Sequence, residues 1–273
     1  MPVISTNIAA NAAVRYLNIN SAQESSSLAK LSSGSRITSA SDDAAGLAIS
    51  TRISSDVTAL QQAATNASQA TSILQTADGA ASNISDILAR MKSLASQSAS
   101  GTVTTSSRAY IQSEFSQLSD EIDSISTGTR YSGQTLLGSG SAFSSGISVL
   151  VGSSSTDTIN ITLSTINSST LGVSLDISTQ TGATTALTAL DSAIDTVSKA
   201  RADIGAQESR FNFSADTIAT QVQNLQSANS AIKDVDIASE QAKLSSAEVK
   251  TQAAVSAETA ANQMPQYLLK LLG

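Results

Sequence analysis

Two long stretches of this chain carry apolar residues at coiled-coil spacing, and they flank a middle segment with a different pattern. The first stripe repeats every seven residues, with a second set three residues later: Ile53, Leu60, Ala67, Leu74, Ala81, Leu88 and Ala95, then Ala63, Ala70, Ala77, Ile84 and Met91. The second stripe alternates steps of three and four: Leu187, Leu190, Ile194, Val197, Arg201, Ile204, Glu208, Phe211, Ala215, Ile218, Val222, Leu225, Asn229 and Ile232. Such patterns predict long helices packed side by side. We therefore expect the chain to run out along one helix and return antiparallel along another.

Both ends of the chain predict a further helix each. The first begins near Ser5 or Thr6 and ends at Gly34, a left-handed C-cap. Its seam is Val14, Leu17, Ser21, Glu24, Leu28 and Leu31, and Ile4 and Ile8 lie ahead of this seam. The last carries Ala247, Thr251, Ala254, Ala257, Ala261, Met264, Leu268 and Leu271. Pro265 lies inside this last helix and predicts a kink or an early end, because proline removes a backbone hydrogen bond.

Acidic pairs stand at the helix boundaries. Ser41-Asp42-Asp43 precedes the first long stripe, and Asp234 and Asp236 separate the second stripe from the last helix. Short polar side chains accept hydrogen bonds from the free N–H groups of a helix start, so we interpret both pairs as caps. An acid–base or metal role is the alternative, but the sequence supplies no partner base.

The middle of the chain changes from helical to strand periodicity. A third helix, with Ile111, Phe115, Leu118, Ile122 and Ile125, ends near Gly128. Three later runs then alternate apolar and polar residues: 147–151, 159–163 and 173–177. This alternation, bounded by Gly, Ser and Asn, predicts short half-exposed strands. The fold class is therefore mainly α: long antiparallel helices form paired coiled coils from both chain ends, and a small β-hairpin insertion lies in the middle.

The composition favours an assembling protein over an enzyme. Aromatic residues make up 3% of the chain, Trp is absent, and Ala and Ser fill much of the helical stripes. Each CH₂ that an Ala lacks relative to Leu forfeits roughly 0.8 kcal/mol of burial. Helices with such thin seams need several neighbours, and further copies of the same chain can supply them. The polar seam residues Arg201, Glu208 and Asn229 then fix the helix register rather than bind a ligand.

The residue inventory excludes several function classes. The chain has no Cys and no His, which removes thiolate nucleophiles, histidine-based catalysis and Cys/His zinc sites. We predict no enzymatic activity and no cofactor. A net charge of −7 argues against nucleic acid as a partner. No apolar run reaches membrane-spanning length, and residues 1–7 lack the features of a secretory signal, so we expect no membrane insertion and no cleaved signal peptide.

Five segments resemble the bacterial flagellin family, in the order that the family has. They are residues 31–37 (LSSGSRI), 41–49 (SDDAAGLAI), 130–137 (RYSGQTLL), 204–211 (IGAQESRF) and the C-terminal 260–272 (AANQMPQYLLKLL). The resemblance implies an extracellular filament subunit for swimming motility, exported unfolded through the flagellar type III apparatus. It also implies self-polymerisation and contact with an export chaperone and with the flagellar cap and hook-junction proteins. The short middle segment implies a thin, smooth filament.

The resemblance divides the chain into three parts. Residues 1–40 and 234–273 would form a terminal coiled-coil inner core, residues 41–138 and 185–233 an outer helical-bundle domain, and residues 139–184 a short variable β segment of that outer domain. We expect the terminal parts to be largely disordered in the free monomer and to fold on assembly. The reason is that their Ala- and Ser-rich seams bury too little apolar area to offset the conformational entropy that is lost on ordering. A hook–filament junction protein is the close alternative, and a secreted coiled-coil adhesin is a more distant one.

These implications assign roles to particular residues. The predicted inner core for polymerisation comprises Ile4, Ile8, Val14, Leu17, Leu28, Leu31, Ala254, Ala257, Ala261, Met264, Leu268 and Leu271. The predicted outer-helix packing comprises Leu60, Leu74, Ile84, Leu88, Met91, Ile194, Val197, Ile204, Phe211, Ile218, Val222 and Leu225. Arg90, Leu94 and Glu114 match family positions that face an animal innate receptor; packing between helix surfaces is the alternative for these three.

Overall fold

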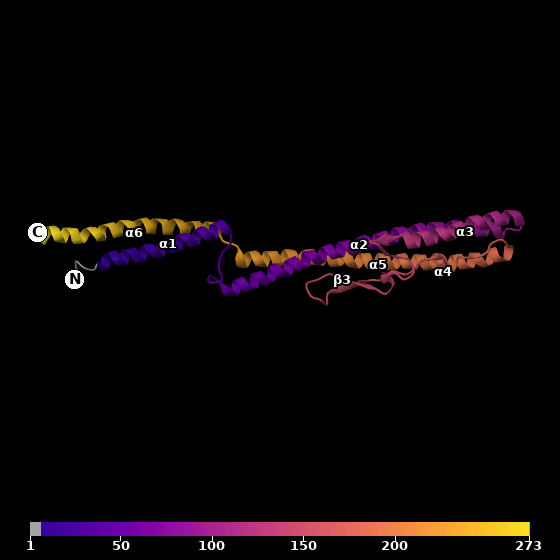
Figure 1. Cartoon of the computed structure of the whole chain (residues 1–273), viewed down its shortest axis with the longest axis horizontal. Coiled ribbons are helices and arrows are strands. Elements are labelled where there is room, and N and C mark those ends of the chain that lie inside the picture. Colours follow the sequence, from indigo (N-terminus) through magenta and orange to yellow (C-terminus); the bar gives the residue numbers. More distant parts are fainter. Residues whose placement is uncertain (1–6, 273) are drawn as a thin grey trace. The chain divides into compact units, whose positions relative to one another are not determined.

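The computed structural model describes residues 7–272 and divides them between two compact units. Unit 1 comprises the chain up to Ser55 together with the chain from Asn224 onward, and unit 2 comprises Asp56–Gln223. The long helices are α1 (Ile8–Ser33), α2 (Ala44–Ala99), α3 (Thr105–Gly128), α5 (Gln180–Lys233) and α6 (Ile237–Leu272) (Figure 1). Long helices from both ends of the chain and a small hairpin region confirm the predicted fold class.

Unit 1 contains the pair formed by α1 and α6. Asn7 caps α1, since its side-chain oxygen accepts a hydrogen bond from the Ala10 N–H at 3.1 Å. The same side chain donates to the Ala261 carbonyl of α6 at 2.8 Å. At the other end of α1, Gly34 adopts φ 67°, which confirms the predicted left-handed C-cap. The two helices therefore lie antiparallel, with the start of α1 beside the later turns of α6.

The connectors at the far end of this pair are joined by backbone hydrogen bonds. Ser35 and Asp234 form an isolated antiparallel bridge. The Arg36 N–H donates to the Lys233 carbonyl at 2.6 Å, and the Val235 N–H donates to the Gly34 carbonyl at 3.1 Å. The Arg36 guanidinium also donates to the Ile232 carbonyl at 2.9 Å. The segment that follows α1 and the segment that precedes α6 are therefore held together by backbone hydrogen bonds.

The acidic pairs act at helix boundaries, but only one member of each caps a helix start. Asp43 Oδ1 accepts from the Gly46 N–H in the first turn of α2, and Asp236 Oδ1 accepts from the Ala238 and Ser239 N–H groups of α6. Asp42 instead accepts from the backbone N–H and hydroxyl of Thr38 and from the Ser39 N–H. These three bonds hold the pKa of Asp42 at about 2, chiefly through the Thr38 hydroxyl. Asp42 thus stabilises the connector and not the helix.

The last helix continues past Pro265 to Leu272, so of the two predicted effects of this proline, a kink or an early end, the early end is wrong. A proline inside a helix removes one backbone N–H donor but leaves the neighbouring turns bonded. The predicted start of the first helix at Ser5 or Thr6 lies outside the described residues.

Unit 2 has a conventional apolar core. Its fully buried side chains come from the middle of α2, from α3, from α5 and from the segment between α3 and α5; the largest are Phe115, Phe211, Leu74, Ile84, Leu88, Met91, Ile122, Leu136, Leu137, Ile161, Leu163 and Ile166. The heptad residues Ala67, Ala77 and Ala81 of α2 are buried with them. The large side chains fill the space that these alanines leave, which is why an Ala-rich helix can take part in a dense core.

Two short antiparallel hairpins lie between α3 and α5. In the first, β1 (Arg130–Tyr131) pairs with β2 (Gln134–Thr135) across Ser132 and Gly133, which both have positive φ. In the second, β3 (Ile147–Leu150) pairs with β4 (Thr158–Ile161), with Ile147 opposite Ile161. A 3-10 turn η1 (Ala142–Ser144) precedes β3, and a one-turn helix α4 (Ser168–Leu171) follows β4.

The β3–β4 hairpin is attached to the helices of unit 2 by side chains. Asn66 of α2 donates to the Leu150 carbonyl at 3.1 Å. Gln207 of α5 both accepts from the Thr162 N–H and donates to the Thr162 carbonyl, at 2.8 and 2.9 Å. Figure 1 shows this hairpin alongside α2 and α5.

The prediction of a strand over 173–177 is wrong. Val173 and Ile177 are buried, as the alternation required, but this segment has no strand beside it among the described residues. Gln112 of α3 takes the place of a partner strand: its side chain accepts from the Ile177 N–H at 2.6 Å and donates to the Leu175 carbonyl at 3.3 Å. Ser98 of α2 donates to the Ile177 carbonyl at 2.5 Å. Side chains of two helices therefore satisfy an extended backbone that the sequence pattern alone assigns to a sheet.

Candidate self-assembly surface

The seam between α1 and α6 consists mostly of small and polar residues. Its members are buried or half-buried and step alternately by three and four: Ala10, Ala13, Leu17, Asn20, Glu24, Ser27 and Leu31 on α1, and Glu240, Leu244, Ala247, Thr251, Ala254, Glu258 and Ala261 on α6. This spacing is that of the a and d positions of a heptad repeat. Small a and d residues let two helices approach closely, but they bury little apolar area.

Polar side chains make hydrogen bonds within the seam, both between the two helices and along α6. The Thr251 hydroxyl donates to Glu24 at 3.3 Å. Glu240 is buried, and its carboxylate accepts from the Lys243 ammonium one turn later on α6 at 2.9 Å. This hydrogen bond from Lys243 lowers the pKa of Glu240, which opposes the effect of its burial. A charged group in a thin seam specifies how helices pair more than it stabilises the pair.

Most large side chains assigned to the inner core lie outside this seam. Of the predicted set, Ala254 and Ala261 are buried and Leu17 and Leu31 are half-buried, whereas Ile8, Val14, Leu28, Ala257 and Met264 are exposed. Val14 and Leu28 each lie one residue after a true seam position. Ile4 lies outside the described residues, as do the side chains of Leu268 and Leu271. The predicted packing of the large residues against the partner helix is therefore wrong for Val14 and Leu28.

The α1–α6 pair carries exposed apolar residues on all its outer faces. They are Ile8, Val14, Tyr16, Ile19 and Leu28 on α1, and Ile237, Val249, Val255, Met264 and Tyr267 on α6. The sequence patterns did not single out Tyr16, Ile19, Ile237, Val249 or Val255. Their signal is that large apolar residues stand off the seam in helices otherwise built from Ala, Ser and Gln. Exposed apolar residues in this number on one helix pair mark an interaction surface.

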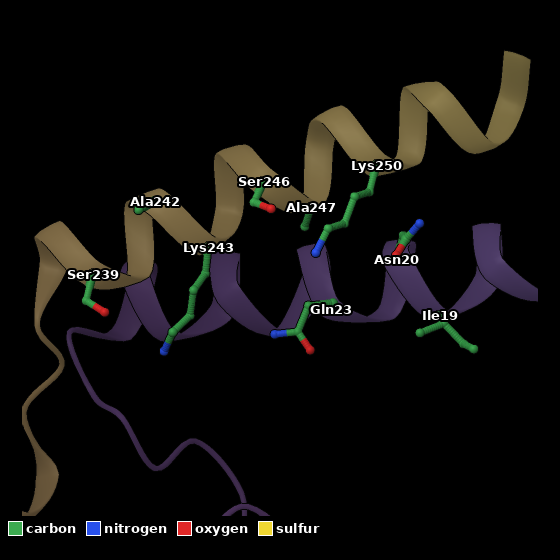
Figure 2. A pocket seen from close by; sticks show the side chains of 9 residues that line it. All are labelled: Ile19, Asn20, Gln23, Ser239, Ala242, Lys243, Ser246, Ala247 and Lys250. Carbon is green, nitrogen blue, oxygen red and sulfur yellow. The ribbon is translucent and has the colours of Figure 1, made fainter.

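One side of the pair is hollowed into a shallow groove. It is lined by Ile19, Asn20 and Gln23 of α1 and by Ser239, Ala242, Lys243, Ser246, Ala247 and Lys250 of α6. Figure 2 shows the side chains of Lys243 and Lys250 extending from α6 toward α1 along this groove. The groove lining therefore combines small and uncharged polar side chains, one large apolar side chain and two ammonium groups.

The residues assigned to outer-helix packing lie inward. Leu60, Leu74, Ile84, Leu88, Met91, Val197, Ile204, Phe211 and Ile218 are buried, and Ile194, Val222 and Leu225 are half-buried. The polar seam residues of α5 have partners on α2. Arg201 donates two hydrogen bonds to Asp78, at 2.9 and 3.3 Å, and Glu208 accepts from Gln75 at 2.9 Å. Asn229 donates to the Ser54 hydroxyl at 3.3 Å.

The three residues assigned to a receptor-facing surface separate in the structure. Arg90 and Glu114 are exposed and form an ion pair between α2 and α3, with an N–O distance of 2.6 Å. Leu94 is only 2% exposed and belongs to the core of unit 2. The prediction that Leu94 faces outward is therefore wrong; the position follows the heptad stripe three residues after Met91.

The described residues contain neither a metal site nor a membrane-spanning segment. No group of three or more acidic side chains there could hold a metal ion. No described helix is both long enough and apolar enough to cross a bilayer.

Comparison with known proteins assigns the chain to a family. The model of the bacterial flagellin N-terminal helical region matches residues 4–142, and that of the bacterial flagellin C-terminal helical region matches residues 187–272. The chain belongs to the bacterial flagellin family. A flagellin of Halalkalibacterium halodurans is 36% identical, and a flagellar filament 30.7 kDa core protein of Treponema maltophilum is 35% identical; each comparison covers 99% of both chains. The predicted resemblance is thus confirmed.

Solved structures agree with this assignment. The crystal structure of Bacillus cereus flagellin is similar with a TM-score of 0.52 and 30% identity, over 60% of this chain and 94% of that one. A putative flagellar hook-associated protein from Vibrio parahaemolyticus has a TM-score of 0.60 but 16% identity over 71% of this chain and 100% of that one, so it shares the fold alone. For this flagellin, the predicted function as a structural subunit of the filament is confirmed, and the hook–filament junction alternative is not favoured.

Proposed function

We propose that this flagellin polymerises through its α1–α6 pair, which forms the inner core of an open helical filament. The observation that carries this proposal is the contrast between a thin seam and large exposed apolar residues on the same two helices. Such a pair buries its large side chains only when further copies surround it. Contacts that do not close on themselves then generate a filament instead of a ring.

The proposed division of labour follows the predicted parts of the chain. Residues 1–40 with 234–273 would be the inner core, and residues 41–138 with 185–233 the outer helical bundle, which carries 139–184. The compact units divide within α2 and α5 and not at residues 41 and 233. Because both helices are continuous there, we infer that the outer bundle begins inside the first turns of α2 and the last turns of α5.

The remaining partners and the location follow from the same role. We infer an extracellular position in the flagellar filament, type III export, and contacts with an export chaperone and with cap and hook-junction proteins. The protein would have no enzymatic activity, because it lacks both His and Cys and its role is mechanical. The names of the relatives from Treponema and Halalkalibacterium support a filament location.

Seeded growth tests the proposal directly. The purified full-length chain is added to short filament seeds and observed by electron microscopy, beside a version that lacks residues 1–30. We expect filaments from the full chain only. Growth of the truncated chain would refute a core built from the termini. Failure of both under conditions that polymerise another flagellin would contradict the filament role.

A matched pair of variants separates folding from assembly. Leu28 is 58% exposed on α1, so Leu28→Asp should leave the unfolding of the monomer almost unchanged. It should nevertheless stop elongation, because it places a charge where a neighbouring copy must pack. Ser25→Asp, also on exposed α1 but with no apolar side chain to lose, is the control and should retain more growth.

A further inference from the structure

The two sides of the α1–α6 pair carry opposite charges. On an antiparallel pair, the g positions of both helices border one side and the e positions border the other. The side that contains the groove, the lysine flank, has the g residues Tyr16, Gln23, Lys30, Lys243, Lys250, Ala257 and Met264. The opposite side, the glutamate flank, has the e residues Val14, Ser21, Leu28, Gln241, Glu248, Val255 and Asn262. Every charge in the first set is positive, and the single charge in the second is negative.

Both flanks also carry exposed apolar side chains. Tyr16 and Met264 are exposed on the lysine flank, and Val14, Leu28 and Val255 are exposed on the glutamate flank. The lysine flank thus combines exposed apolar side chains with three lysines, and the glutamate flank combines exposed apolar side chains with Glu248. Lys250 and Glu248 have no ion-pair partner among the described residues, whereas Lys243 is bonded to Glu240.

The charge balance of unit 1 as a whole fits self-association. Unit 1 contains eight basic and eight acidic residues, whereas unit 2 contains seven basic and fourteen acidic ones. The entire net charge of −7 therefore belongs to unit 2, and copies of unit 1 can pack closely without net repulsion.

We propose that neighbouring copies of this flagellin pack with the glutamate flank of one α1–α6 pair on the lysine flank of the next, and that Glu248 of one copy pairs with Lys250 of the other. This proposal rests on the proposed function and specifies which surfaces of neighbouring copies are in contact. The occupant of the groove is a second copy of this chain, because its own opposite flank has the complementary charge and apolar residues of similar size. The two surfaces in this contact differ, so each added copy leaves one flank free to bind the next copy. Repeating such a contact produces an open polymer.

Charge reversal tests this pairing without removing any helix. Lys250→Glu puts a carboxylate near the middle of both flanks, and Glu248→Lys puts an ammonium group near the middle of both. Each variant alone then brings like charges together at every contact, and we expect its critical concentration for seeded growth to rise at least about tenfold. The double variant, with both reversals in one chain, restores complementary flanks and should grow nearly as the unchanged chain does.

Mixing the two single variants is the sharper test, because it requires no further substitution. In an alternating polymer, the carboxylates of the Lys250→Glu variant face the ammonium groups of the Glu248→Lys variant at every contact. The mixture should therefore elongate seeds at concentrations where neither variant does. High salt should also reduce the difference between the variants and the unchanged chain.

The outcomes separate this inference from the proposed function. Single variants that grow like the unchanged chain would overturn the pairing while leaving the filament role intact. Single variants that fail, with no rescue in the mixture or in the double variant, would overturn it as well, since the loss would then have another cause. No growth of the unchanged chain would contradict the filament role, and the pairing with it.

Discussion

Unit 1 and unit 2 are built from similar Ala- and Ser-rich helices but differ in the size of the side chains that they bury. In unit 2, alanines of α2 are buried in one cluster with large side chains such as Phe115 and Phe211, and a core forms within one chain. In unit 1, the seam between α1 and α6 consists mostly of small and polar residues, and most of the large apolar side chains of the two helices remain exposed. Apolar content alone therefore does not make an autonomous core. What matters is whether large residues and small residues face each other across an interface.

The largest expected effect of this difference is on local stability in the free monomer. We expect amide protection from hydrogen exchange in α1 and α6 to be at least about hundredfold lower than in residues 67–95 of α2 and 183–211 of α5. The reason is the small apolar area of the α1–α6 seam. Hydrogen exchange measured by mass spectrometry on monomer and on filaments checks this, and protection of α1 and α6 should rise on assembly. Equal protection of both units in the monomer would contradict the comparison.

A core truncation in unit 2 should have the next largest effect. Phe115 is 1% exposed, so Phe115→Ala should lower the free energy of unfolding of unit 2 by about 3–5 kcal/mol. Phe213 on α5 is 73% exposed, and Phe213→Ala is the matched control, with an expected change within about 0.5 kcal/mol. Urea unfolding followed by circular dichroism measures both. Similar losses for the two variants would show that the burial contrast is incorrect.

The ion pair between α2 and α5 should contribute less. Arg201 and Asp78 form two hydrogen bonds, but both side chains are 38% exposed and screened by solvent. Arg201→Ala should therefore lower the free energy of unfolding of unit 2 by about 0.5–1 kcal/mol. A double-mutant cycle with Asp78→Ala isolates the pair from other effects of truncation. Strictly additive single losses would mean that the pair contributes no coupling.

The smallest expected effect is the pH dependence of the connector in unit 1. The pKa of Asp42 is lowered from 3.8 to about 2 by the hydrogen bonds from Thr38 and Ser39. A carboxyl whose folded-state pKa is depressed stabilises the fold above its unfolded pKa. This contribution is present above about pH 4 and is lost as the pH falls toward about 2. An NMR titration of Asp42, with the amide shifts of Thr38 and Ser39 as reporters, measures it; Asp42→Asn should abolish the transition. A midpoint near the unfolded value would show that the three bonds do not form.

Several features could be predicted from the sequence because they depend on local chemistry. The heptad stripes place helices along most of the chain, since side chains three and four residues apart share a face. Gly34 ends α1 because only glycine adopts φ 67° without strain. The alternation around Ile147 and Ile159 predicts a hairpin, since successive strand residues point to opposite faces.

The candidate site could be predicted only in outline. The terminal helices and their apolar residues are evident in the sequence, and so is their need for several neighbours. The prediction placed the large residues Val14 and Leu28 against the partner helix. In the structure, Ala13 and Ser27 occupy those positions. The offset is a single residue, yet it exchanges a buried face for an exposed one.

Only the contacts between helices show which face of each helix packs against its partner. An isolated helix with Ala, Ser and scattered large residues has more than one candidate face, and the partner selects the one that permits close approach. In the same way, Val173–Ile177 has the alternation of a strand, but Gln112 and Ser98 reach its backbone from two helices, and no described strand lies beside it. Local sequence patterns specify where helices form and end and where charge lies. Which apolar residues remain for a second copy depends on contacts between distant segments, and periodicity along one helix carries no information about its partner.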